Sequence, residues 1–399
     1  MAHGTKIDRR KINKRNHIID LFRQNGPLSK AQARELSRYS MDTIISIFDS
    51  LIEDRLIVAA AGEQKKKGRK AQFYDLNHKR RLYLGTTFNA SGIFSSVVSF
   101  SRREVERFTT RLPSPVGRDE LVELFTSHIE SIVSSYSGPD GGITAVGCSV
   151  PGDIDHETGI LKSYTFIPSL TDLNFIDLIS KTAPETRVVT DHNVRSMIEY
   201  ILNNGAVTEE RETVLFVSAR SGAASGLIHK GQVVTDRGEL GHIKVTDEKA
   251  RCICGRSGCL DCYFSLNSFL EISSQDPVEN GGVPDAALLD RLAREYRNGD
   301  GEIRRELDRR LHLFTIALLN VINVTVPDLV ILTGGLFKIY GDPVKRIREI
   351  TAEHFEDGGY INHFVNADFE YLDIGPEIAA IGICHRLIGE EWRFHEEER

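Results

Sequence analysis

Four residues that can bind a metal stand close together in the segment GHIKVTDEKARCICGRSGC, residues 241–259. Three of the chain's 6 cysteines fall there in the pattern C-x-C-x4-C, with glycines that allow a tight loop between the sulfurs. Three thiolates and one imidazole fill the four positions of a tetrahedral Zn2+ and leave none for water, so the pattern predicts a structural zinc site. Cys262 is an alternative fourth ligand, because it forms C-x2-C with the last cysteine of the pattern. The predicted ligands are His242, Cys252, Cys254 and Cys259.

The composition around this cluster is that of an ordinary globular protein. The chain has 399 residues, 40% hydrophobic and 27% charged, enough for two or three domains with sizeable cores. It contains no run of about 18 apolar residues, so no membrane helix is expected. The first residues, MAHGTKIDRRKINKRN, are polar and basic, unlike a secretory signal. We therefore expect a cytoplasmic protein whose clustered cysteines bind metal or remain thiols rather than form disulfides.

Charge is distributed unevenly along the chain. Residues 1–82 contain 19 Lys and Arg against 9 Asp and Glu, a net charge of +10, whereas the remainder carries −17. A basic head on an acidic body indicates that the head contacts a polyanion. The alternative is a solvated basic tail.

The basic head has the pattern of three short helices. Helical spacing of apolar residues in NKRNHIIDLFRQNG predicts the first, which ends before Pro27. The second opens at Ser29, where Gln32 completes a capping-box pattern. The third begins at Ser40 and has an apolar stripe formed by Ile44, Ile47, Phe48 and Leu51. Three short helices with a tight turn between the second and third predict a helix-turn-helix.

This motif would present the start of its third helix to base edges of double-stranded DNA. Short or polar side chains occupy that position in SMDTIIS, and Asp42 can accept a hydrogen bond from a cytosine amine or merely cap the helix. The helical residues predicted to contact DNA are Ser29, Lys30, Ser40, Met41, Asp42, Thr43 and Ser46.

A β-hairpin with a cationic tip follows the helices. Residues 56–60 and 71–76 read as its two strands, and the segment KKKGRK lies between them. This is the pattern of the wing of a winged helix, and cations on its tip suit phosphate or minor-groove contacts. The predicted wing contacts are Lys65, Lys66, Lys67, Arg69 and Lys70.

From residue 83 the pattern changes to alternating strands and helices. Strands rich in β-branched residues, such as ITAVGCSV and TVLFVSA, alternate with amphipathic helices such as NVRSMIEYIL. This alternation predicts an α/β fold with a mixed or parallel sheet covered by helices. Glycines after strand ends, as in LTGG, mark places where such sheets bind phosphates or small molecules.

The string GELGHIKV…CICGRSGCLD resembles the signature of the ROK family, which comprises repressors, open reading frames and sugar kinases. The resemblance extends over nearly the whole chain. Family kinases lack the basic head, whereas family repressors carry a winged helix-turn-helix that ends in a basic Gly-Arg segment similar to KKKGRK.

The resemblance implies a fold and a domain organisation. Residues 1–80 would form a winged helix-turn-helix, and residues 81–399 a two-lobed actin-like ATPase fold of the ROK type. Lobe one would comprise about 81–192 plus 381–399, and lobe two about 193–380. A sugar would bind in the cleft, and the zinc would support the loop that shapes the sugar site.

Two phosphate loops of the family's kinases are altered here. The first, similar to G-x-D-x-G-G-T, matches GTTFNAS from Gly85, in which Thr87 replaces the Asp that handles metal and phosphate. The second, G-x-G-x-G, reads GAASG from Gly222 without its middle glycine, although Gly334 and Gly335 remain where adenosine would bind. Because phosphoryl transfer depends on Mg2+ held by carboxylate, these departures predict that the chain is not an enzyme.

The sugar site is better retained. The resemblance assigns sugar contacts to Asp191, Glu239, His242, Asp261, Ser169 and Thr190. Asp191 matches the family's catalytic base, here vestigial, and it can alternatively cap the following helix. Thr190 and Ser169 stand where the family has Asn, and Asp261 stands where many members have Glu. Several carboxylates without an ATP loop suit the binding of a polyol, since each accepts hydrogen bonds from hydroxyls.

Three functional hypotheses follow. The first is a sugar-responsive repressor that binds palindromic operator DNA as a homodimer or homotetramer, with a sugar or sugar derivative shifting its DNA-competent population. The second is an active sugar kinase with an accessory head. The third is a DNA-binding regulator controlled by a protein partner instead of a sugar. None of them involves a membrane.

Overall fold

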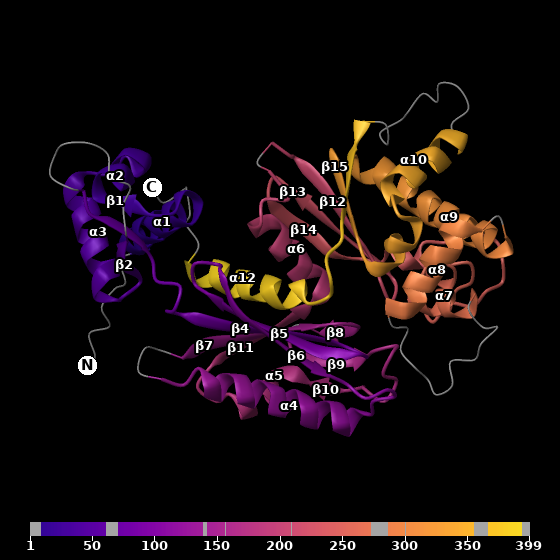
Figure 1. Cartoon of the computed structure of the whole chain (residues 1–399), viewed down its shortest axis with the longest axis horizontal. Coiled ribbons are helices and arrows are strands. Elements are labelled where there is room, and N and C mark those ends of the chain that lie inside the picture. The colour runs from indigo at the N-terminus through magenta and orange to yellow at the C-terminus, as the bar shows by residue number, and fades with distance from the viewer. Residues whose placement is uncertain are drawn as a thin grey trace.

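The structure is a computed structural model, and it describes residues 9–60, 71–138, 142–155, 157–208, 210–272, 286–299, 301–354 and 366–392. Figure 1 shows a small helical domain at one end, followed by two larger lobes. Within the described residues, no helix has the length and apolar character needed to cross a membrane.

The small domain has the elements expected of a winged helix. Its sheet has the order β1-β3-β2, and both strand pairs are antiparallel. The elements are α1 (Arg9–Asn25), β1 (Leu28–Ser29), α2 (Lys30–Ser37), α3 (Met41–Glu53), β2 (Ile57–Ala60) and β3 (Phe73–Leu76). The cationic tip predicted between the strands, which includes Lys65, Lys66, Lys67, Arg69 and Lys70, lies outside the described residues.

Local signals in this domain are confirmed. The Ser29 hydroxyl accepts from the Gln32 backbone N–H at 3.3 Å, and the Gln32 side chain accepts from the Ser29 N–H at 3.0 Å, which completes the capping box. Ser40 caps α3 by accepting from the Thr43 N–H at 3.3 Å. The predicted stripe of α3 is buried: Ile44, Ile47, Phe48 and Leu51.

Lobe one is built on a five-stranded sheet of order β11-β7-β4-β5-β6. Strands β4, β7 and β11 are parallel, and β4, β5 and β6 form an antiparallel meander. Helices α4 (Arg118–Ser135) and α5 (Phe175–Thr182) pack on one face, and α12 (Ile378–Trp392) packs on the other. The strands are β4 (Leu82–Asn89), β5 (Gly92–Ser99), β6 (Glu104–Arg111), β7 (Ile143–Val150) and β11 (Arg187–His192). A small sheet joins β8 (Asp153–Asp155), β9 (Ile160–Ser163) and β10 (Leu173–Asn174).

Lobe two repeats the plan of lobe one. Its sheet has the order β14-β13-β12-β15-β16, again an antiparallel meander followed by two parallel strands. Helix α6 (Asn193–Asn203) covers one face, and α7 (Leu266–Ile272), α8 (Ala286–Asn298), α9 (Glu302–Thr325) and α10 (Pro343–His354) lie on the other side. The strands are β12 (Thr213–Ala219), β13 (Ala223–His229), β14 (Gln232–Gly238), β15 (Leu329–Thr333) and β16 (Asp368–Leu372).

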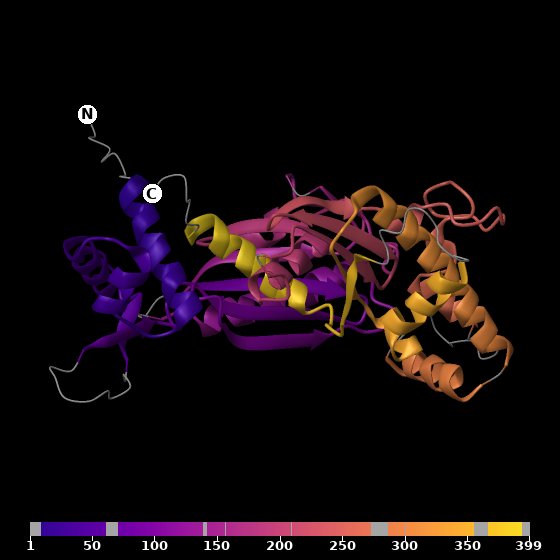
Figure 2. The same cartoon turned by 90° about the horizontal axis from the view of Figure 1, so that it is seen from above.

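Helices α6 and α12 cross between the lobes. A Cβ at Gly382 would lie 1.7 Å from the Ser196 carbonyl oxygen, so only glycine lets the two helices approach this closely. The first turn of α12 joins the core that α6 forms with the lobe-two sheet, and its later turns join the core of the winged helix. Seen from above in Figure 2, α12 runs along the middle of the molecule toward the winged helix. One helix therefore contacts all three parts of the protein.

Candidate functional site

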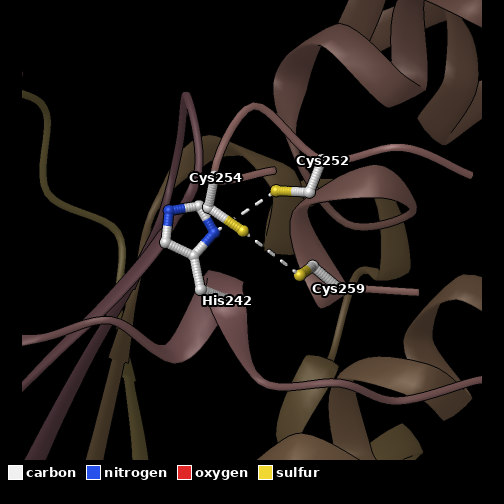
Figure 3. Close-up of side chains that lie close together, drawn as sticks. All are labelled: His242, Cys252, Cys254 and Cys259. Carbon is white, nitrogen blue, oxygen red and sulfur yellow. Dashed lines mark hydrogen bonds between the residues drawn. The ribbon is translucent and has the colours of Figure 1, made fainter. Parts of the chain in front are cut away.

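The predicted metal ligands converge on one point (Figure 3). His242 ends a 3-10 turn that follows β14, Cys252 and Cys254 lie on the next loop, and Cys259 immediately precedes a second 3-10 turn. Their ligand atoms all lie within 4.8 Å of one another, and no other such group of His, Cys, Asp or Glu occurs among the described residues.

The donor set fits a tetrahedral metal ion. Zn–S and Zn–N bonds of about 2.3 and 2.0 Å require an S···S separation of about 3.8 Å and an S···N separation of about 3.5 Å. The Cys254 and Cys259 sulfurs lie 3.7 Å apart, and the Cys252 sulfur lies 3.4 Å from Nδ1 of His242. The sulfurs are therefore too far apart for a disulfide and correctly spaced to bind one ion.

Glycines give the loop its tight course. Gly255 and Gly258 have φ of +86° and +76°, and a Cβ at Gly258 would lie 2.1 Å from the Thr246 carbonyl oxygen. The Cys252 N–H donates to the Arg256 carbonyl at 2.8 Å, which closes the turn between the cysteines. This backbone geometry brings the sulfurs together.

Local charge favours the ligand form of one cysteine. Hydrogen bonds from the backbone and side chain of Arg256 lower the pKa of the exposed Cys254 thiol to about 6. Cys262, the alternative fourth ligand, instead directs its sulfur to the Ala250 carbonyl at 3.6 Å and is not part of the cluster. Among the described residues, the group that could hold an ion therefore includes His242 and not Cys262.

The zinc-side residues of the predicted sugar site lie close together. The Glu239 side chain is exposed, and its Oε2 lies 3.9 Å from Nε2 of His242, whose Nδ1 faces Cys252. Asp261 is mostly buried against Gly222 and Gly241, and its Oδ1 accepts from the Ala223 N–H at 2.9 Å. Burial raises the pKa of Asp261 to about 6, although this N–H and His242 act in the opposite direction.

Asp191, at the end of β11, is tied to the last helix. It is 4% exposed, its Oδ1 accepts from the His192 N–H at 2.8 Å, and its Oδ2 pairs with the Arg386 guanidinium of α12. Burial raises the pKa of Asp191, while Arg386 and the N–H bond lower it. The suggestion that Asp191 caps the next helix is wrong, because His192 is the N-cap and accepts from the Val194 N–H.

The other two residues predicted for the sugar site, Thr190 and Ser169, differ in exposure. Thr190 is 2% exposed in β11, whereas Ser169 is exposed on a turn between β9 and β10 of the small sheet. His192 and Arg386 were not predicted. His192 lies beside Asp191, near the charges of Glu239 and Asp236. Arg386 is 195 residues from its partner, and no sequence pattern linked the two.

The loops that match the kinase phosphate loops are filled by protein contacts. Thr87 is 2% exposed within β4, and the Asn89 side chain accepts hydrogen bonds that close the β4–β5 turn. In the second loop the Ala223 N–H already donates to Asp261. The guanidinium of Arg220, two residues before that loop, donates to the Ile374 carbonyl at 2.5 Å.

The predicted DNA-contacting helical residues divide into two sets. Ser29 is 5% exposed with its hydroxyl in the capping box, and the hydroxyls of Ser40 and Thr43 bond each other at 2.8 Å. The exposed members are Ser40, Asp42 and Ser46, and those with partly exposed side chains are Lys30, Met41 and Thr43. Lys30 pairs with Asp49 of α3 at 3.0 Å.

Comparison with known proteins adds the family. The model of the ROK family matches residues 99–380. The chain belongs to the ROK family. It is 22% identical to the xylose repressor of Bacillus subtilis (strain 168), over 82% of this chain and 83% of that protein. It is 26% identical to the N-acetyl-D-glucosamine kinase of Aliivibrio salmonicida (strain LFI1238), over 70% of this chain and 97% of that one.

Solved ROK structures share the fold. The crystal structure of a ROK family transcriptional regulator, described as a homolog of the E. coli MLC protein, covers 96% of this chain and 98% of its own, with a TM-score of 0.72 and 18% identity. The ROK hexokinase from Thermus thermophilus covers 76% of this chain and 96% of its own, with a TM-score of 0.57 and 18% identity. The predicted fold class is confirmed.

Proposed function

We propose that this ROK protein is a transcriptional repressor that binds operator DNA through its winged helix and a carbohydrate effector between its lobes. The observation that supports this most directly is how much of the chain each solved structure matches. The regulator structure matches 96% of the chain, winged helix included, whereas the hexokinase matches 76%. Two-fold assembly as a homodimer or homotetramer would present two such heads to a palindromic site in the cytoplasm.

The altered nucleotide loops support a role without catalysis. Phosphate binding needs free backbone N–H donors and a carboxylate for Mg2+. Here the Ala223 N–H donates its hydrogen bond to Asp261, and Thr87 stands where the kinases have the carboxylate. Asp191, which matches the catalytic base, is paired with Arg386. ATP turnover is therefore not expected.

We assign Zn2+ to the cluster of His242 and three cysteines. Thiolate-rich tetrahedral sets select zinc among the common divalent ions, and a fourfold protein set leaves no position for a reacting water. When bound, the ion supplies a structural crosslink. His242 and Glu239 lie at one end of the crosslinked loop, so the metal would fix the His242 ring and, beside it, the Glu239 carboxylate.

Zinc-loaded protein tests the carbohydrate part. Thermal unfolding would be followed with D-xylose, N-acetyl-D-glucosamine, D-glucose and their phosphates. An effector at 100 times its Kd stabilises by about 2.7 kcal/mol, and a Glu239→Gln variant should lose much of that shift. A regulator controlled by a protein partner predicts no shift with any sugar, and an active kinase predicts ADP formation that Asp191→Asn abolishes.

Selection from random duplexes tests the DNA part. The expected product is a palindrome with half-sites about one helical turn, or a multiple, apart. Replacing Lys65, Lys66 and Lys67 by Ala should weaken binding to all duplexes and flatten its salt dependence, because phosphate contacts release counterions. Ser46→Ala should instead change sequence preference. Failure to enrich any duplex would dismiss the repressor.

A further inference from the structure

The pair formed by Asp191 and Arg386 joins the end of β11, where the predicted sugar-site residues Thr190 and Asp191 lie, to α12, on which the winged helix packs. Arg386 is fixed on two sides, because its Nε also donates to Glu390 at 3.0 Å, and Glu390 pairs with Arg187 of β11 at 2.5 Å. The Asp191 side chain is 6% exposed and that of Arg386 27%. Because the Asp191 carboxylate is buried while Arg386 is partly exposed, a third group that donates to this carboxylate would compete directly with the guanidinium.

The C-terminal half of α12 also forms the surface on which the winged helix packs. Two turns after Arg386, the Trp392 ring packs on Phe100 with centroids 5.5 Å apart, and its Nε1 donates to the Tyr83 hydroxyl at 2.7 Å. Glu391 accepts from the same hydroxyl at 2.5 Å. The last turns of α12 are therefore held by both apolar packing and hydrogen bonds.

Phe100 connects this end of α12 to α1. Its carbonyl accepts from the guanidinium of Arg23, which is almost fully buried and also pairs with Asp20 at 2.6 Å. Apolar residues of α1 and α12 belong to one continuous core: Ile18, Ile19, Leu21 and Phe22 with Leu387, Ile388 and Trp392. The winged helix consequently packs on the C-terminal half of α12 and not on a flexible linker alone.

We propose that Arg386 is a positioning residue of the carbohydrate cleft, through which occupation of the site at Asp191 reaches the winged helix. This proposal rests on the proposed function. Arg386 holds the Asp191 carboxylate and fixes α12 against β11. Effector hydroxyls that donate to Asp191 compete with the guanidinium for the same oxygen, so the two states differ in a direct contact made by α12.

A purely structural role for the pair would have different consequences. It would lower overall stability when broken but leave DNA binding as responsive to effector as before. The proposed role instead changes the coupling, which is the ratio of DNA Kd values with and without effector. Couplings between sites are typically about 5- to 150-fold.

Hydrogen exchange on the full-length, zinc-loaded protein tests the link without any sugar. Arg386→Met keeps the aliphatic stem and removes the charge, and Arg187→Met is the matched control, because it removes the other ion pair that anchors α12 to β11. We expect faster exchange in residues 384–392 and in α1 for Arg386→Met, restoration in Arg386→Lys, and no change in α1 for the control. If Arg386→Met does not fold, Asp191→Asn weakens the same contact from the other side. Unchanged exchange in α1 overturns the proposal.

The second measurement is the coupling itself, with D-xylose and N-acetyl-D-glucosamine as probes and a selected duplex as DNA. The ratio should fall to about 1 in Arg386→Met and recover in Arg386→Lys. A ratio equal to that of the wild type in Arg386→Met overturns the proposal. If the wild type responds to neither these sugars nor D-glucose nor their phosphates, the carbohydrate part of the proposed function fails, and the exchange experiment still decides whether Arg386 links β11 to α1.

Discussion

Replacing His385 by Phe should make the protein less sensitive to acid. The ring is 1% exposed in α12 and lies parallel to that of Tyr200, with centroids 6.2 Å apart. Burial lowers the pKa of His385 to about 4, and the charges of Arg102 and Arg23 act in the same direction. Neither ring nitrogen makes a hydrogen bond of normal geometry. The backbone groups of Arg102 and Glu199 that face the ring act in the opposite direction and raise its pKa less than burial lowers it. Phe keeps the size of the buried ring and removes the group that titrates.

The size of the effect follows from the two pKa values of the ring. An unfolded histidine binds a proton below about pH 6.5, whereas His385 in the folded protein does so only near pH 4. Between these values the unfolded state holds more protons, so the free energy of unfolding decreases as the pH falls. Between pH 8 and pH 5 the His385 ring lowers the free energy of unfolding of the wild type by about 2 kcal/mol. This decrease should be absent in His385→Phe.

Urea titrations at pH 5, 6, 7 and 8 measure the difference. Trp392 is the chain's single tryptophan, 7% exposed on the same helix, so its fluorescence reports unfolding of this region. His229→Gln, at a largely exposed position, is the control and should follow the wild type. If the free energy of unfolding falls equally in His385→Phe and in the wild type between pH 8 and pH 5, the folded protein does not hold a buried, neutral His385, and the reasoning is refuted.

Three further predictions concern other parts of the molecule. Cys254→Ser should reduce bound zinc, measured by mass spectrometry of the metal, from about one ion per chain to a small fraction, and equal content in both proteins would dismiss the site. Gly241→Ala should destabilise by about 1–3 kcal/mol in thermal unfolding, since its Cβ would lie 2.1 Å from Asp261, and an unchanged midpoint would contradict that packing. Ser40→Ala removes the cap of α3 and should cost about 1 kcal/mol, seen as faster hydrogen exchange in that helix, while exchange in α9 serves as the control.

Signals close together in the chain were sufficient for much of this protein. The capping box at Ser29, the stripe of α3 and the alternation of strands and helices each depend on contacts within a few residues. The metal cluster is nearly as local, because one loop of 18 residues supplies every ligand. The family resemblance added the two-lobed arrangement, which the repeated sheet order of the lobes bears out.

Other features were decided by tertiary packing. The segment TDHN offers two side chains that can cap α6, and His192 does so because the Asp191 carboxylate is paired with Arg386 of α12. Asp261 accepts a hydrogen bond from the Ala223 N–H because Gly222 and Gly241, which belong to separate segments, leave room for its carboxylate. Such contacts join residues up to 195 positions apart, and they exist only once both helix and sheet are in place.

The sequence by itself thus determined the elements, the basic head and the clustering of one histidine and three cysteines that could hold a metal, since backbone hydrogen bonding, hydrophobic periodicity and short-loop geometry act over small separations. Only the tertiary structure decided the partner of Asp191, the contacts made by the loops that match the kinase phosphate loops, and the surface on which the winged helix packs. These depend on where α12 packs, and that position is set by the burial of apolar side chains from both lobes and the head together.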